Sequence, residues 1–247
     1  MSPSSFLLLF AALASGLTAM CAVFVFFKGK IRGFSLTFMA NLLFFNLLFI
    51  LSLVFNISGW PQGEGPKFLQ IAEFRSAVLF GMTVLKFAWI YAFVEMTHQV
   101  IRKTLKKGFR RFYISVSALL LLWLFITYAD QMDSMRRMIA ASIVVFIESL
   151  ILAAALAALI VLIHRTHHSP EITSKRAVYG FAGIYIALFC LLIISLILGM
   201  FLDLEKGGGF FQIRAAQMIA YNILPLLWLR RYAGTVGPAA VIGGGAP

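Results

Sequence analysis

The sequence predicts an all-α integral membrane protein, a bundle of seven transmembrane helices with its N-terminus outside and its C-terminus in the cytoplasm. Three observations predict this class. Hydrophobic residues make up 62% of the 247 positions, more than a water-soluble core of this size buries. Clusters of charged residues divide the chain into seven apolar stretches, and the positive charge is concentrated in every second cluster.

A helix needs about 20 residues to cross the hydrocarbon layer, and each apolar stretch reaches or nearly reaches this length. The first stretch lacks a preceding basic segment and is longer than the core of a signal peptide, so we expect it to remain as a helix. The predicted spans are 5–27, 35–57, 75–98, 112–129, 137–164, 176–202 and 211–229.

The basic clusters predict the orientation of the bundle. The clusters that follow the first, third, fifth and seventh spans hold fourteen basic residues and one acid, Glu171. The alternate clusters hold six basic and six acidic residues. Lys and Arg are retained on the cytoplasmic side of short loops. We therefore expect a bacterial-type inner membrane, with basic loops that face anionic lipid and do not bind nucleic acid directly.

The segment after Arg231 changes in composition. Residues 232–247 are rich in Gly, Ala and Pro, which predicts a flexible linker or tail on the cytoplasmic side. A linker at this place is typical of the membrane part of a longer protein, and a simple disordered tail is the alternative. Cys21 and Cys190 fall within predicted spans and imply no disulfide.

Two ionisable residues within the spans are candidates for function, because a charge at mid-membrane is costly unless it is paired or used. Lys86 and Glu148 lie at equal depth in the third and fifth spans, which run in the same direction, so we predict a buried contact. The pair either only fixes helix packing or lines a polar pocket and changes partners when a ligand arrives. Tyr185 and the Gln217 face are the alternative partners for Lys86.

The seventh span carries the densest set of polar residues. Arg214, Gln217 and Tyr221, at spacings of three and four, share one helical face that we expect to look into the bundle. Pro225 removes a backbone hydrogen bond near Tyr221 and lets the helix bend, and Asn222 is placed to satisfy the freed groups. The bend is either a moving part or a feature of packing.

Two amides lie within the second span. Asn41 and Asn46 supply groups for hydrogen bonds between helices, and a role in ligand binding is the alternative.

The four histidines cluster near the inner ends of the third and fifth spans. Glu95 and His98 share a helical face at a spacing found in carboxylate-bridged metal sites, and His164 with His167 or His168 would complete a ligand set. Solvated interfacial histidines are the alternative. No cofactor is predicted, since the sequence holds no recognisable catalytic or nucleotide-binding motif.

The last span ends in the sequence Asn-Ile-Leu-Pro-Leu-Leu-Trp-Leu-Arg-Arg-Tyr, residues 222–232. This ending and the seven spans resemble the seven-helix sensory regions of bacteria, which precede LuxR-type helix-turn-helix or histidine-kinase output domains. The resemblance implies a membrane sensor that binds a small or lipidic ligand and signals to a cytoplasmic output module, with transcription regulation as one outcome. An integral-membrane enzyme or small transporter built on the same polar residues is the alternative.

Overall fold

The computed structural model describes residues 3–28, 33–58, 72–100, 107–129, 175–201 and 209–236, with scattered positions between 143 and 164. Apart from turn residues at 27, 28 and 33, every described residue is helical, which confirms the all-α class. The long helices are α1 (Pro3–Phe26), α2 (Phe34–Ser58), α3 (Ala72–Val100), α4 (Lys107–Ala129), α6 (Lys175–Phe201) and α7 (Gly209–Val236).

The helix bounds follow the predicted spans closely, with two differences at the basic ends. Helix α4 begins at Lys107 rather than at 112, because Lys and Arg are good helix formers whose apolar stems can lie along the helix. The predicted linker starts too early. Helix α7 continues through Val236, since Arg230, Arg231 and Ala233 all favour a helix. Residues 237–247 lie outside the described part.

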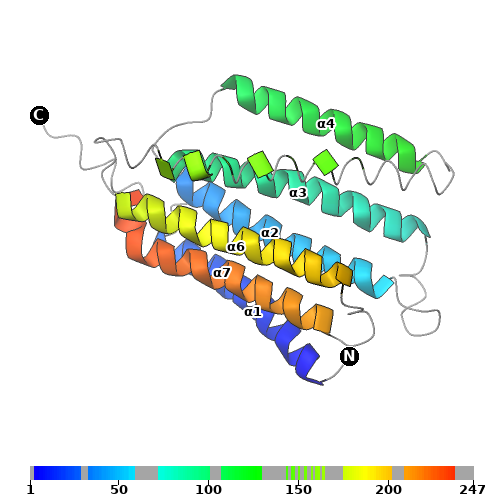
Figure 1. Ribbon diagram of the computed structural model, residues 1–247, viewed down its shortest axis with the longest axis horizontal. Helices are drawn as coiled ribbons and strands as arrows, with labels where there is room; N and C mark the ends of the chain where they lie inside the picture. The colour runs from blue at the N-terminus through cyan, green and yellow to red at the C-terminus, as the bar shows by residue number, and fades with distance from the viewer. Residues whose placement is uncertain are drawn as a thin grey trace, which may run out of the picture.

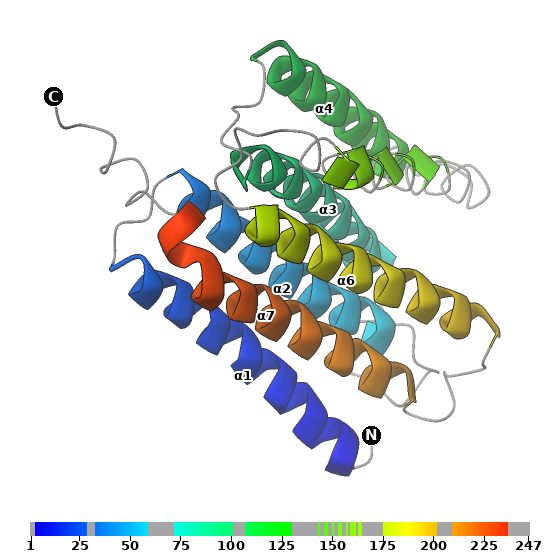
Figure 2. The same ribbon diagram turned by 60° about the vertical axis from the view of Figure 1, so that its left-hand side comes forward.

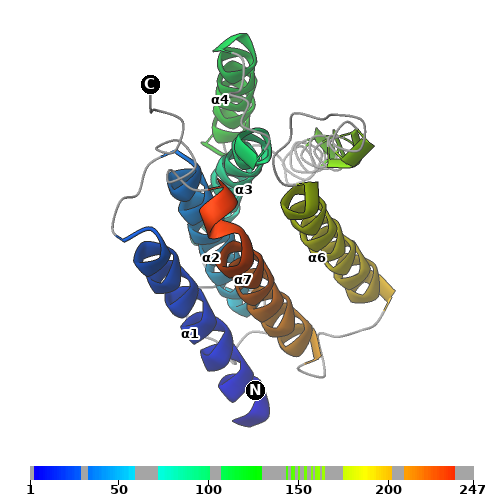
Figure 3. The ribbon, with the colours of Figure 1, turned by 90° about the vertical axis from the view of Figure 1, so that its left-hand side faces the viewer.

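The helices lie side by side in a tilted bundle (Figure 1). Helix α7 lies between α1 and α6 and also packs against α2, while α2 packs along α3 (Figures 2 and 3). Helix α4 packs on α3 at the edge of the bundle, away from α1. Helices α2, α3, α6 and α7 therefore surround one central volume.

Within the described ranges, five helices are long and apolar enough to cross a membrane: α1, α2, α3, α4 and α6. Their composition makes the chain a multi-pass helical membrane protein. Helix α7 is more polar than these five because it holds Arg214, Gln217, Asn222 and two terminal arginines. Its place among α1, α2 and α6 turns much of that polar surface toward other helices and away from lipid.

Aromatic side chains fill the centre of the bundle. Phe93, Tyr185 and Phe189 are each almost completely buried, and the rings of Phe93 and Phe189 meet edge to face with centroids 5.0 Å apart. Trp228 fastens the end of α7 to the start of α6, because its indole Nε1 donates to the carbonyl of Ala177 at 2.8 Å. The interior is thus rigid and tightly packed.

One end of the bundle carries a set of exposed basic residues, here called the basic end. It is formed by the C-termini of α1 and α7 and the N-termini of α4 and α6, which gather on one side in Figure 1. Its described basic residues all come from the clusters that the sequence predicts to be cytoplasmic: Lys28, Lys107, Arg110, Arg111, Lys175, Arg176, Arg230 and Arg231.

Candidate functional site

Four side chains from four helices form a hydrogen-bonded group in the middle of the bundle, here called the central network: Asn41 of α2, Trp89 of α3, Tyr185 of α6 and Tyr221 of α7. The indole Nε1 of Trp89 donates to the hydroxyl of Tyr221 at 2.8 Å. That hydroxyl donates to Oδ1 of Asn41, also at 2.8 Å. All four residues are at most 5% exposed, so these bonds lie in a low-dielectric interior where they strengthen one another.

Tyr185 is the loosest member of the central network. Its hydroxyl lies 3.4 Å from Oδ1 of Asn41 and 3.8 Å from the sulfur of Met96. Nδ2 of Asn41 donates to the backbone carbonyl of Trp89 at 3.5 Å. Asn41 therefore joins α2 to α3, α6 and α7, which confirms the predicted role of this amide in bonding between helices.

A second group, here called the asparagine clamp, joins α7 to α1 and α2. Nδ2 of Asn46 donates to Oδ1 of Asn222 at 3.0 Å, and Nδ2 of Asn222 donates to Oδ1 of Asn46 at 3.1 Å. Nδ2 of Asn222 also donates to the hydroxyl of Ser15 at 3.1 Å. Both N–H groups of Asn222 are engaged in the clamp, so this amide does not satisfy the backbone carbonyl that Pro225 leaves free. The prediction for Asn222 is corrected in that respect.

The close approach of α1 to the clamp depends on Gly16. A Cβ atom at this position would lie 2.3 Å from Oδ1 of Asn46 and 3.2 Å from the terminal carbon of Met218. Any larger residue would push the amide out of its hydrogen-bonded position. The glycine thus serves the packing of three helices around one polar pair.

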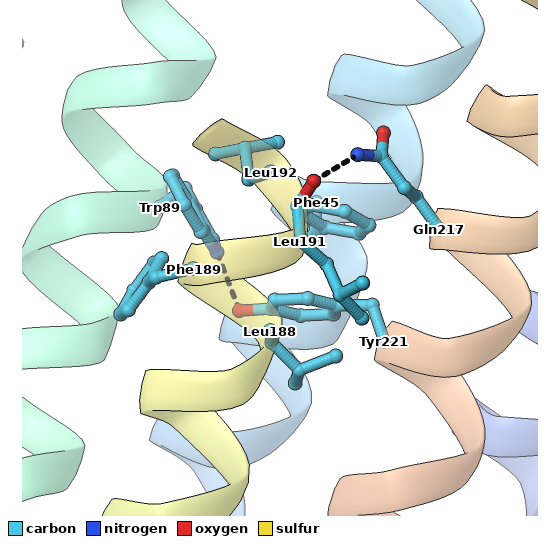
Figure 4. Close-up of a pocket in the computed structure, with 8 residues that line it drawn as sticks. All are labelled: Phe45, Trp89, Leu188, Phe189, Leu191, Leu192, Gln217 and Tyr221. Atoms are coloured by element: carbon cyan, nitrogen blue, oxygen red, sulfur yellow. Dashed lines mark hydrogen bonds between the residues drawn. The ribbon is translucent and has the colours of Figure 1, made fainter. Parts of the chain in front are cut away.

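A recess adjoins the central network between α6 and α7 (Figure 4). It encloses about 10 Å³, and about 280 Å³ when its open mouth is included. The enclosed part has room for about one water molecule. The ring of Phe45 stacks on that of Tyr221 at its wall, with centroids 3.6 Å apart. The lining residues are Phe45, Trp89, Leu188, Phe189, Leu191, Leu192, Gln217 and Tyr221.

Gln217 bridges the mouth of this recess. Its Nε2 donates to the backbone carbonyl of Leu191 on α6 at 3.0 Å, as the dashed line in Figure 4 shows. Its Oε1 accepts from Nη1 of Arg214 at 3.5 Å, one turn away on α7. The predicted face of Arg214, Gln217 and Tyr221 therefore runs from the half-buried mouth of the recess to the buried central network.

An ion pair joins α3 to α4 near the basic end. The carboxylate of Glu95, which is buried, accepts from Nη2 of Arg110, and Nε2 of Gln99 donates to the same oxygen at 3.3 Å. The hydroxyl of Thr37 on α2 donates to Oε1 of Gln99 at 2.7 Å. Glu95 thus takes its partners from an arginine and an amide rather than from the predicted set of histidines.

Two of the four histidines, His98 and His164, belong to the described residues. Nδ1 of His98 donates to the carbonyl of Val94 within its own helix at 2.9 Å, and His164 is exposed. Among the described residues, no group of three His, Cys, Asp or Glu side chains is arranged to hold a metal ion. His167 and His168 lie outside the described residues.

The predicted contact of Lys86 with Glu148 stays a prediction. Lys86 is half-buried near the middle of α3, and Glu148 lies outside the described residues. Tyr185, the alternative partner for Lys86, directs its hydroxyl toward Asn41 and Met96.

Trp89 of the central network and Ser15 of the asparagine clamp were not predicted from the sequence. A tryptophan in the middle of a span resembles any other apolar residue, yet its N–H needs a partner when it is buried. Ser15 is followed by Gly16, and such pairs of small residues allow helices to approach closely. The depth of a donor or acceptor within its span is the one signal that the sequence offers for both residues, and depth alone does not say which groups meet.

Comparison of the chain with protein-family models, with curated proteins and with solved structures gives no match.

Proposed function

We propose that this protein is a membrane-embedded sensor. A small or lipidic ligand binds in the recess between α6 and α7, shifts α7 against α1 and α2, and thereby signals to a cytoplasmic output module. The bundle has seven spans in a bacterial-type inner membrane, with the N-terminus outside and the basic end in the cytoplasm. The concentration of Lys and Arg at one end of the described helices supports this orientation.

The adjacency of Tyr221 and Asn222 carries the proposal. Tyr221 lines the recess and belongs to the central network, whereas Asn222 holds α7 to α1 and α2 through the clamp. A ligand that displaces the ring of Tyr221 acts on the neighbouring backbone, and that backbone also sets the position of the Asn222 amide. Ligand binding and the packing of α7 are therefore coupled through one peptide bond.

Pro225 gives α7 a place to bend just beyond these two residues. It lies within the helix and is buried, and it has no N–H to donate to the carbonyl of Tyr221 four residues earlier. The missing bond lowers the cost of a hinge between the recess and the basic end. Movement at this hinge reaches Arg230 and Arg231 near the end of α7.

The test uses the purified chain in lipid nanodiscs, with one spin label at position 28, in the turn after α1, and one at position 230 on α7. Distances between the labels are measured with and without fractions of an organic-solvent extract of the native cells. We expect at least one fraction to shift the distance distribution in the wild type. The Pro225→Ala variant should fold normally and show a much smaller shift, because its helix regains the backbone hydrogen bond.

Two outcomes bear against this function. If no fraction moves α7, the chain is not a ligand sensor of this kind. If Pro225→Ala responds as fully as the wild type, Pro225 is a packing feature and the signal takes another route. The matched control is Leu227→Ala, an exposed position on the same turn of α7, which should leave the response unchanged.

A further inference from the structure

We infer that the ligand reaches the recess sideways from the bilayer, through the seam between α6 and α7, and that it is an uncharged lipophile with one hydrogen-bonding oxygen. Medium-chain alcohols and ketones are the simplest members of this class. The inference rests on the proposed function for its biological meaning, but the site itself is testable alone. Three features of the seam carry it.

The first feature is the surface around the mouth. Leu191 at the mouth is 44% exposed, and Ile194 of α6 and Ile223 of α7, on the same two helices, are exposed as well. In a helix that crosses a membrane, such a surface is in contact with acyl chains and not with water. A molecule that enters here must first dissolve in the hydrocarbon, which disfavours a charged ligand.

The second feature is the lining. The walls are aliphatic and aromatic, from Leu188, Leu192, Phe45 and Phe189, and every residue that lines the recess is uncharged at neutral pH. The indole N–H and the phenol O–H of the central network are already engaged with one another and with Asn41. The wall therefore selects an apolar body.

The third feature is Gln217, whose side chain links α7 to α6 at the mouth of the recess. Its N–H bonds to the carbonyl of Leu191, which lies inside α6, where a helical carbonyl already has its own backbone partner. This second bond is therefore replaceable: when α6 and α7 separate, the same N–H can donate to an oxygen of the ligand. The class of ligand follows, since one acceptor oxygen replaces one carbonyl and the rest of the molecule stays in apolar surroundings.

The closed seam explains why entry requires movement. The enclosed space of about 10 Å³ suits one water molecule and not an alkyl chain. Opening must break the bond from Gln217 to Leu191 and separate the side chains that close the mouth. The hydrogen bond to ligand oxygen and the burial of its chain offset that cost.

The experiment uses octanol that carries a photoreactive diazirine, with diazirine-bearing octane as the matched probe without oxygen. The chain in nanodiscs is irradiated, and adducts are located by mass spectrometry with and without excess octanol. We expect adducts of the alcohol on recess residues to be competed by octanol. Adducts of the alkane on lipid-facing residues should not saturate.

Three variants separate the site from its alternatives. Leu192→Trp fills the recess and should reduce the competed adducts at least tenfold, whereas Ile193→Trp, on the lipid-facing side of the same helix, should leave them unchanged. Gln217→Leu removes the donor and should weaken binding of the alcohol about fivefold to tenfold, toward that of the alkane. Thermal unfolding of each variant shows whether it has folded.

A cleavable crosslink tests the route independently of these variants. Cysteines at positions 191 and 217, in a background with Cys21 and Cys190 changed to serine, are joined by a short bifunctional reagent. Joining should abolish the competed adducts. Cleavage should restore them to the level of the unjoined double-cysteine variant, which is lower than in the wild type because the Gln217 donor is missing. Equal labelling of the joined form, or no competed adducts in the wild type, would overturn the inference.

The two proposals fail in different ways. If octanol labels the recess but no ligand moves α7, the binding site stands and the sensory function falls. If an extract fraction moves α7 while the recess is never labelled, the sensor stands and this site is wrong.

Discussion

Asn46 and Asn222 form a reciprocal pair of amide hydrogen bonds across α2 and α7, at 3.0 and 3.1 Å, in the middle of a membrane-spanning bundle. Each amide satisfies the other, and the hydroxyl of Ser15 takes the remaining N–H of Asn222. A pair of this kind specifies which helix faces which, because any other register leaves polar groups without partners in an apolar medium.

The first prediction concerns this pair. Asn46→Leu and Asn222→Leu should each destabilise the bundle by about 1–3 kcal/mol, because the remaining amide is buried without its partner. The double variant should recover most of the loss, and a double-mutant cycle of unfolding free energies measures the coupling. Thr18→Val is the control, since this exposed hydroxyl bonds only to the backbone of its own helix at Ala14. Additive losses would contradict the reciprocal pair.

Gly16 provides the second prediction. Gly16→Ala places a methyl group 2.3 Å from Oδ1 of Asn46 and should lower thermal stability despite the higher helix propensity of alanine. Gly183→Ala is the matched control, because nothing lies within 4 Å of its added Cβ. It should be neutral or stabilising, by up to about 1 kcal/mol. The double variant with Gly16→Ala and Asn46→Ala should lose less stability than the sum of the two single variants, because the methyl group no longer meets an amide. Additive losses would mean that the clash lies elsewhere.

The third prediction ranks the two tyrosines of the central network. Tyr221→Phe leaves the buried N–H of Trp89 without an acceptor and should cost about 1–3 kcal/mol. Tyr185→Phe removes two long contacts, at 3.4 and 3.8 Å, and the interaction of its hydroxyl with Tyr221, and should cost less than about 1 kcal/mol. Thermal unfolding in nanodiscs measures both. A larger loss for Tyr185 than for Tyr221 would show that the network is organised around α6 instead.

The sequence allowed the helices to be predicted because their lengths and apolar composition depend on local residues alone. Asn41, Tyr221 and Asn222 were recognised for a related reason, since a polar side chain within an apolar span is conspicuous. Their partners were not predictable, because Trp89 and Ser15 are ordinary residues in such a span. Which polar groups meet depends on the rotation of each helix about its axis, and that rotation is set by packing across the whole bundle.

The partner of Glu95 was not predicted for the same reason, since it depends on how α3 and α4 pack. Its spacing from His98 suggested a metal site, whereas among the described residues the buried carboxylate pairs with Arg110 of α4. The guanidinium supplies the opposite charge at Oε1, whereas Oε2 of Glu95 is buried without a hydrogen-bond partner among the described residues. The end of α7 was misjudged for another reason, since Gly and Ala after Arg231 resemble a linker although alanine also continues a helix.

The proposed orientation of the bundle yields the fourth prediction. Cysteines at Gln62 or Gly208 should react with an impermeant reagent added from outside, and a reporter fused after Arg231 should be cytoplasmic, because Lys and Arg gather at the opposite end. A cysteine at Thr104 is the internal control and should react only after the membrane is opened. Labelling of Thr104 from outside would reverse the orientation.

The last prediction concerns the ion pair of Glu95 with Arg110. Glu95 is 5% exposed in its side chain and Arg110 40%, so the carboxylate is the member that depends on its partner. Arg110→Gln should therefore destabilise the bundle measurably, by about 1–3 kcal/mol, since a buried carboxylate loses a charged hydrogen-bond donor. Arg111→Gln, at the exposed neighbouring position, should change stability by less than about 0.5 kcal/mol. In the Glu95→Gln background the effect of Arg110→Gln should shrink, because a neutral amide needs no counter-charge. An undiminished effect in that background would show that Arg110 stabilises α4 by another contact.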